Sequence, residues 1–322
     1  MTQKVLLSEI NNYLGKNCDL FICSSSFEER CFSISRNINK SIINSSWVVY
    51  NGDGETEIKT NAETLLQIYD NNASLIEVSM DDPLYTADRI REKIIVELNK
   101  NVIDNVFIDI TTFTHEALLI LIKLFYLYCP NAEITCLYTN ALEYSVGEEK
   151  KYKWLSNGIR ELRSVLGYAG NIIPSRKNHL IMIVGYEYER AMRIINTIEP
   201  NSLSLGFGRS CSATTEKDKE ANEYYLQLVE EMATYYTDIF KFEIPCDSPN
   251  KIIEELNRQI ACAEDKNIII VPMNNKISTI GVALTAIKNE NIQLCYAPAI
   301  SYNYRNYSIP GNNCYIYKIE WK

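Results

Sequence analysis

The same pattern of an apolar run, a polar turn and a Glu-Arg pair occurs twice in this sequence. Residues 21–30 read FICSSSFEER, and residues 181–190 read IMIVGYEYER. Further matches follow in the same order: Gly52-x-Gly54 with Gly206-x-Gly208, Asp81-x-Pro83 with Asp247-x-Pro249, Tyr138 with Tyr296, and Ala141 with Ala299. Matches that keep their order and their place in the pattern indicate an internal duplication, with a period far too long for a solenoid. The chain is therefore expected to hold two similar domains.

Each half alternates short apolar runs with amphipathic segments. The runs that we interpret as strands are 20–23, 47–50, 75–79, 106–110 and 133–138 in the first half, and 180–184, 203–205, 240–244, 268–271 and 292–296 in the second. Short continuous apolar strands that alternate with helices are typical of a parallel sheet covered on both faces. The sequence thus predicts an α/β protein of two tandem Rossmann-like domains, residues 1–146 and 179–322, joined by an amphipathic connecting segment, 147–178. Alternation near residues 314–319 predicts an edge strand.

Composition narrows the classes of partner. The formal net charge is -9, which argues against a protein that coats bulk nucleic acid. Only two histidines are present and no cysteines are spaced as Cys-x-x-Cys, so we predict no metal site. The Gly-x-Gly turns follow the second strand of each half rather than the first, which disfavours an NAD fingerprint, and we predict no cofactor. No apolar run approaches the ~20 residues that cross a bilayer. These features predict a cytoplasmic protein that does not bind membranes.

Ligands of parallel α/β sheets bind where the strands end at their carboxyl termini. The polar residues that recur there in both halves are Glu29 with Glu189 and Arg30 with Arg190. Two interpretations stay open for these pairs. They contact a ligand, or they clamp a helix to a neighbouring strand end.

The loops after the fourth strand of each half differ from one another. Residues 109–116 read DITTFTHE, and residues 272–276 read PMNNK. Hydroxyls, amides, a lysine and free helix N–H groups are the donors that a phosphate group needs. This pattern favours contact with a phosphate or nucleotide; the alternative is a capped helix start.

In this arrangement the chain resembles the CARF sensor domains and their fused, pseudo-dimeric relative, the SAVED domain. Those families bind cyclic oligonucleotide signals of prokaryotic antiviral defence. The resemblance implies ligand contacts at the following positions: Ser24, Ser25, Ser26 and Glu29 after the first strand, Thr111, Thr112 and Thr114 after the fourth, and Gly185, Tyr186, Asn274, Asn275 and Lys276 in the second half.

We therefore predict binding of a nucleotide or another phosphorylated small molecule, as a sensor or effector component of a prokaryotic defence or signalling system. Arg30 and Arg190 supply positive charge. A first alternative is a hydrolase or transferase that cleaves nucleotides or nucleosides, with Glu29, Asp109 or Glu116 as general base or nucleophile. A second is a protein-interaction scaffold. A protein partner and a homo-oligomer both stay open.

Overall fold

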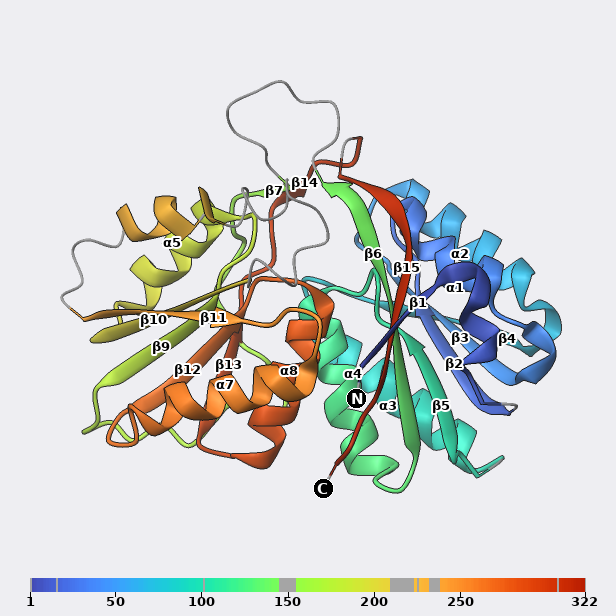
Figure 1. The fold of residues 1–322 in the computed structure, drawn as a ribbon. Coiled ribbons are helices and arrows are strands. Elements are labelled where there is room, and N and C mark those ends of the chain that lie inside the picture. Colours follow the sequence, from blue (N-terminus) through green and yellow to red (C-terminus); the bar gives the residue numbers. More distant parts are fainter. Residues whose placement is uncertain are drawn as a thin grey trace. The chain divides into compact units, whose positions relative to one another are not determined.

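The computed structural model describes residues 2–15, 17–100, 102–144, 155–208, 223–224, 226–231, 238–305 and 307–321. The chain divides into two compact units. Unit 1 comprises Met1–Glu143 together with Ser308–Lys322, and unit 2 comprises Tyr144–Tyr307. Each unit is an α/β fold with its own largely parallel sheet (Figure 1).

Unit 1 has a seven-stranded sheet in the part of the chain that the structure describes. Its strand order is β1 (Gln3–Leu6), β15 (Ser308–Lys318), β6 (Glu133–Tyr144), β5 (Asn105–Asp109), β2 (Cys18–Ser24), β3 (Ile43–Asn51) and β4 (Ala73–Val78). Strands β2 to β6 are parallel, whereas β1 is antiparallel to β15. Its helices are η1 (Leu7–Asn12), η2 (Glu29–Phe32), α1 (Ser33–Asn37), η3 (Lys40–Ile42), α2 (Thr56–Ile68), η4 (Asp70–Asn72), α3 (Pro83–Leu98) and α4 (His115–Tyr128).

Unit 2 has a six-stranded sheet within the described residues. The strand order is β11 (Ile239–Ile244), β10 (Ser202–Gly208), β9 (Asn178–Ile183), β12 (Asn267–Pro272), β13 (Ile292–Tyr296) and β8 (Arg163–Ser164). All of these strands are parallel except β8, which is antiparallel to β13. Strands β7 (Ser156–Asn157) and β14 (Ser301–Tyr302) form a separate antiparallel pair. The helices include α5 (Tyr188–Ile198), α7 (Pro249–Ala261) and α8 (Lys276–Lys288).

The two sheets share one topology. Read in chain order, the parallel strands of each unit are arranged third, second, first, fourth, fifth: β4-β3-β2-β5-β6 in unit 1 and β11-β10-β9-β12-β13 in unit 2. These are the first five strands of the six-stranded Rossmann order 3-2-1-4-5-6, with the switch point between the first and fourth strands. The predicted fold class, two Rossmann-like domains from an internal duplication, is confirmed.

Alternating side chains of the strands form a core on each face of the sheet. In unit 1, Phe21 and Cys23 pack with residues of α1 and α2 on one face. On the other face, Trp47 lies beside Phe125 of α4, with ring centroids 6.4 Å apart. Figure 1 shows α1 and α2 on one side of this sheet and α3 and α4 on the other. In unit 2, strands β9, β10 and β12 pack against apolar residues of α5 in the same way. Both faces are covered, as the continuous apolar strands predict.

In both sheets a further strand lies beside the fifth parallel strand, which is β6 in unit 1 and β13 in unit 2. In unit 2 this is β8, and the residues after it continue along β13, where the Val165 amide donates to the Leu294 carbonyl at 2.9 Å. In unit 1 it is β15, where the Ile319 amide donates to the Ile134 carbonyl at 2.8 Å. We call residues 155–168 the connecting strap and residues 308–319 the C-terminal strap.

The straps correct two predictions. The C-terminal strap is not an edge strand, because β1 pairs with its outer side. The domain boundaries also differ from the predicted ones, because residues 308–322 belong to unit 1 and the described part of the connecting segment, 155–178, belongs to unit 2. Residues 147–154 of that segment lie outside the described residues. Local sequence pattern predicts a strand, but it does not say with which sheet the strand pairs.

Candidate functional site

The loop after the fourth strand crosses the switch point in both units. In unit 1 the Thr112 hydroxyl donates to the Ser24 carbonyl at 2.7 Å. In unit 2 the Asn274 side-chain amide donates to the Val184 carbonyl at the same distance, 2.7 Å. Ser24 and Val184 occupy equivalent places in the duplicated pattern. These hydrogen bonds join the loops after the first and fourth strands, which brings the predicted site residues of each unit together.

Most predicted ligand-contacting side chains of unit 1 bond to the protein itself. Ser24 and Ser25 donate to the carbonyls of Ser25 and Ile58, at 3.3 and 2.6 Å. The Ser26 hydroxyl accepts from the Glu28 amide at 3.2 Å. Ser24, Ser25 and Ser26 are all buried. These hydroxyls therefore shape the loop after β2.

The threonines of the following loop are used in the same way. Thr111 donates to Asp109 through its amide and its hydroxyl, and its hydroxyl oxygen accepts from the Thr139 amide at 3.0 Å. The Thr114 hydroxyl caps α4 by accepting from the Ala117 amide at 3.2 Å. A Thr at this position satisfies one of the free amides at a helix start. The threonine-rich sequence is thus explained by local structure.

Arg30 is buried, and its acidic partner is Glu28 rather than the neighbouring Glu29. The Arg30 Nε and Nη2 donate to Glu28 Oε2 at 2.8 and 2.6 Å, and Nη1 donates to the Thr139 carbonyl at 3.3 Å. Glu29 is exposed and pairs with Arg36. Because Thr139 lies in β6, Arg30 joins the start of η2 to the fifth parallel strand. This is the clamp interpretation.

Arg190 repeats the arrangement in unit 2. Its Nη1 donates to Glu187 Oε2 at 2.7 Å, and its Nε donates to the Ala297 carbonyl at 2.9 Å. The guanidinium carbon also lies 5.2 Å from the centroid of the Tyr296 ring. Burial lowers the pKa of Arg190, but Glu187, Tyr296 and Tyr302 together outweigh burial, so the pKa is raised. Glu189, the matched residue of the sequence pattern, is exposed.

Sequence reasoning missed both acidic partners for a geometric reason. Glu28 precedes Arg30 by two residues, whereas Glu187 precedes Arg190 by three, so the partners do not align in the repeat. The aligned residues, Glu29 and Glu189, are exposed instead. The carbonyl acceptors do align, since Thr139 and Ala297 each follow a matched tyrosine.

The three carboxylates proposed for an enzyme have different surroundings. Asp109 is 2% exposed at the end of β5, and its Oδ1 accepts from the Thr111 hydroxyl at 2.5 Å. Burial raises the pKa of Asp109 to about 7, although Thr111 and Arg30 lower it. Glu116 is buried in the first turn of α4, and Glu29 is exposed. Perturbed carboxyl groups at switch points are candidates for catalysis, but a polar network inside a fold perturbs a carboxyl in the same way.

In unit 2 the two switch-point loops lie against each other. A Cβ atom added to Gly185 would stand 2.0 Å from the Met273 carbonyl oxygen, so only glycine fits there. Asn275 caps α8 by accepting from the Ser278 amide at 2.9 Å, and its side-chain amide donates to the Cys246 carbonyl. Lys276 is the half-buried first residue of α8. Gly185, Asn274, Asn275 and Lys276 thus form one compact group.

Tyr186 belongs to a cluster of aromatic residues in unit 2. Its ring centroid lies 5.4 Å from that of Tyr144, which lies 6.4 Å from Tyr307. Tyr302 lies 6.3 Å from both Tyr307 and Tyr304. We call these five residues the tyrosine cluster; all of them are half-buried. The number of tyrosines in 302–307 is visible in the sequence, but their meeting with Tyr186 is not.

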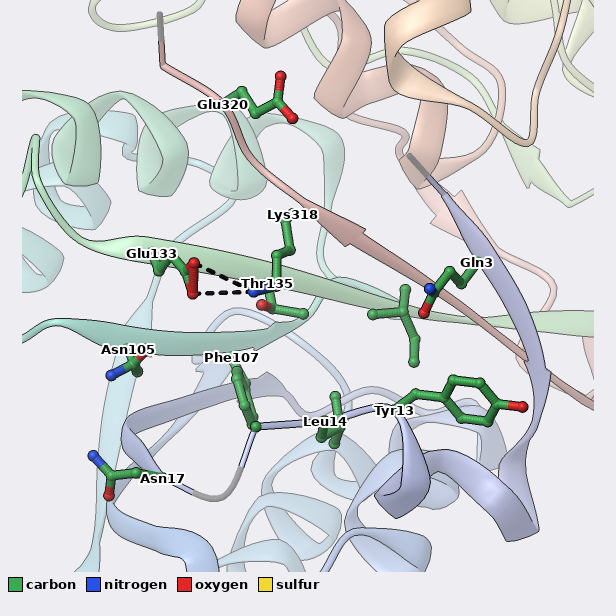
Figure 2. Close-up of a pocket in the computed structure, with 12 residues that line it drawn as sticks. Gln3, Tyr13, Leu14, Asn17, Asn105, Phe107, Glu133, Thr135, Lys318 and Glu320 are labelled. Carbon is green, nitrogen blue, oxygen red and sulfur yellow. Dashed lines mark hydrogen bonds and ion pairs between the residues drawn. The ribbon is translucent and has the colours of Figure 1, made fainter.

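A cavity of about 200 Å³ lies in unit 1 at the other ends of the strands. Figure 2 shows it beside the ion pair of Glu133 with Lys318, whose Nζ is 3.0 Å from the nearer carboxylate oxygen. Asn17, Asn105 and Glu133 line it and mark the amino ends of β2, β5 and β6. None of the predicted site residues lines this cavity. It is therefore separate from the carboxyl-end loops.

Two further observations concern the described residues only. No group of three or more His, Cys, Asp or Glu side chains in the described ranges is arranged to hold a metal ion. In the same part of the chain, no helix combines the length and the apolar character needed to span a membrane.

No protein-family model and no curated protein matches the chain. Among solved structures, one that resembles it is the cytoplasmic domain of a prokaryotic cation chloride cotransporter, with 10% identity, a TM-score of 0.28, and coverage of 88% of this chain and 96% of that one. Another is a keto acid-selecting NRPS module with adenylation, ketoreductase and pseudo Asub domains, with 10% identity, a TM-score of 0.25, and coverage of 89% and 30%. Likenesses this low carry no argument about function.

Proposed function

We propose that this protein binds a nucleotide or another phosphorylated small molecule at the carboxyl ends of the unit 2 strands. The observation that carries the proposal is the tyrosine cluster. Its member Tyr186 follows Gly185, which belongs to the compact group of Gly185, Asn274, Asn275 and Lys276. Half-buried tyrosines offer ring faces on which a base can stack, at ~1–3 kcal/mol per base.

The group beside Tyr186 offers a phosphate its lysine and main-chain amides, because the side-chain amides of Asn274 and Asn275 already donate to the Val184 and Cys246 carbonyls. Lys276 stands at the first position of α8, where the helix dipole and the amides of the first turn favour an anion. The N-terminus of α5 begins at Tyr188, two residues after Tyr186. An aromatic surface next to a lysine and two helix starts matches a ligand that has a planar base and an anionic group.

The biological role in the proposal, a sensor or effector component of a prokaryotic defence or signalling system, rests on the resemblance to CARF and SAVED domains. That resemblance also selects the ligands to be tried first, which are cyclic oligonucleotides. In unit 1 the hydroxyl groups of the equivalent loops form hydrogen bonds with the protein itself. We therefore assign the ligand to unit 2.

The test is a thermal-shift screen of the full chain against cyclic and linear nucleotides. A ligand at about 100 times its Kd stabilises the native state by about 2.7 kcal/mol, or roughly 5–10 °C for a unit of this size. Titration calorimetry then compares Lys276→Met with Lys288→Met. Both lysines belong to α8, at opposite ends of a helix about 20 Å long.

We expect Lys276→Met to weaken binding about tenfold or more, through loss of a charge-assisted contact, and Lys288→Met to leave it unchanged. Tyr186→Ala is expected to weaken binding by a similar factor through lost stacking. Equal effects of the two lysine changes would refute the assignment of the site to this end of α8. No response to any nucleotide would refute the ligand class.

An enzyme is the second candidate, and Asp109 is the observation that favours it. A carboxyl group with a pKa of about 7 at a switch point suits a general base. Its burial and its two hydrogen bonds from Thr111 favour a structural role instead. If the protein turned over a nucleotide and Asp109→Asn abolished this activity, an enzyme would become the first candidate function.

A further inference from the structure

Each buried Glu-Arg pair also contacts a serine from a strap. In unit 1 the Ser308 hydroxyl donates to Glu28 Oε2 at 2.6 Å, and Arg30 Nε lies 3.2 Å from the same hydroxyl oxygen. Ser308 is the first residue of β15 and of the C-terminal strap. The serine therefore completes a group of three side chains, although it lies 278 residues after Arg30 in the sequence.

Unit 2 contains the same group. The Ser156 hydroxyl donates to Glu187, whose other carboxylate oxygen accepts from Arg190 at 2.7 Å. Ser156 is the first residue of β7 and lies in the connecting strap. In both units the carboxylate thus accepts from an arginine of its own repeat and from a serine of the strap.

The straps are exchanged between the repeats. The connecting strap follows the first repeat in sequence, yet β8 pairs with β13, the fifth strand of the second repeat. The C-terminal strap follows the second repeat, yet β15 lies beside β6, the fifth strand of the first. Each sheet therefore receives its antiparallel strand from the segment that follows the other repeat. Subunits of a strand-exchanged dimer have this connectivity, here within one chain.

We propose that Glu28–Arg30–Ser308 and Glu187–Arg190–Ser156 are equivalent anchors that hold the two exchanged straps in place. The proposal goes beyond the proposed function and is independent of any ligand. It accounts for the retention of both arginines, because each repeat must secure a segment that it does not itself supply.

Burial makes these hydrogen bonds important. The side chains of the ion pairs are 4% and 8% exposed in unit 1 and 5% and 11% exposed in unit 2. A buried carboxylate needs its lone pairs filled by donors, since water does not reach it to replace a lost one. The arginine donates hydrogen bonds to the carboxylate, and the strap serine donates a further one. A strap that moved away would leave its carboxylate short of a donor, and this cost opposes opening of the strap.

The test is hydrogen exchange of the full chain, read by mass spectrometry on peptides from both straps. Ser308→Ala is expected to speed exchange in 308–318 by about tenfold or more and to leave 156–168 unchanged, because a local opening becomes more frequent. Ser156→Ala is expected to do the reverse. Each variant is thus the control for the other, and Ser308→Thr, which keeps a hydroxyl, should restore slow exchange.

Every outcome bears on the proposal. Reciprocal local effects with rescue by threonine support it. Unchanged exchange in both straps would show that the serine contacts anchor nothing, and equal acceleration in both straps would show global destabilisation instead of anchoring. A response to only one serine would refute the equivalence of the two anchors.

Discussion

Replacing Asp109 by asparagine should stabilise unit 1 at neutral and alkaline pH and leave its stability unchanged in acid. In the native structure one carboxylate oxygen, Oδ1, accepts from the Thr111 amide at 3.0 Å and from its hydroxyl at 2.5 Å. An asparagine oxygen can keep both bonds. The asparagine side chain thus mimics the neutral form of Asp109, the form that burial favours.

The magnitude follows from the two pKa values. Burial raises the pKa of Asp109 from 3.8 to about 7 in the folded protein. Below pH 3.8 the carboxyl is neutral in both states, so the stability it contributes is fully present there. As pH rises through about 7, the unfolded chain has lost its proton and the folded chain is forced to lose it too. At 1.36 kcal/mol per pKa unit, wild-type unit 1 loses about 4 kcal/mol of unfolding free energy across this range.

Urea unfolding at pH 4 to 8 measures the effect. Trp47 is fully buried in unit 1, and Trp321 belongs to the same unit, so tryptophan emission in a Trp154→Phe background follows unit 1. We expect the stabilities of wild type and Asp109→Asn to differ by less than about 1 kcal/mol near pH 4, and the gap to widen to about 4 kcal/mol by pH 8. A gap that is independent of pH, or one below about 1 kcal/mol at pH 8, would refute the reasoning.

Three further predictions concern other parts of the fold. His179 lies between the hydroxyls of Ser202 and Ser204, and burial together with the nearby Lys266 lowers its pKa from 6.5 to about 4. The unfolding free energy of unit 2 should therefore fall by up to about 3 kcal/mol as pH falls through this range. In calorimetric melting, His179→Gln should remove this dependence of stability on pH. Gly185→Ala should destabilise unit 2 by more than about 2 kcal/mol, because the new methyl group would lie 2.0 Å from a main-chain oxygen. Gly15→Ala is the control and should be tolerated, because the nearest atom to its methyl group would be 3.8 Å away. Thermal melting of both variants decides this. Lys318→Met should change the stability by less than about 1 kcal/mol, since its ion pair with Glu133 is exposed; a larger loss in urea unfolding would contradict this.

Much of the fold was predictable because its signals are local. Apolar runs, turn residues and helix starts repeat in both halves, and they identify the strands of both parallel sheets. Thr114 and Asn275 are read from the sequence as residues of helix starts, and both cap a helix. The strand order follows once each repeat is recognised as a Rossmann-like domain.

The candidate site was predictable only as a region. The polar loops do lie at the strand carboxyl ends, where Thr112 and Asn274 join neighbouring loops. The sequence did not reveal that most of these donors bond to the protein itself. It also did not reveal that Tyr144 and Tyr307 meet beside Tyr186. Both facts depend on contacts between residues that are distant in the chain.

The duplicated Glu-Arg pattern shows which features follow from the sequence alone and which depend on the tertiary structure. The sequence by itself determined that Arg30 and Arg190 stand at equivalent places in two α/β repeats, because hydrophobic periodicity and turn chemistry are properties of short segments. Only the tertiary structure decided that their partners are Glu28 and Glu187, and that Ser308 and Ser156 complete each group. The reason is physical: a buried charge selects partners by distance in space, and here the two serine partners lie in straps exchanged between the repeats.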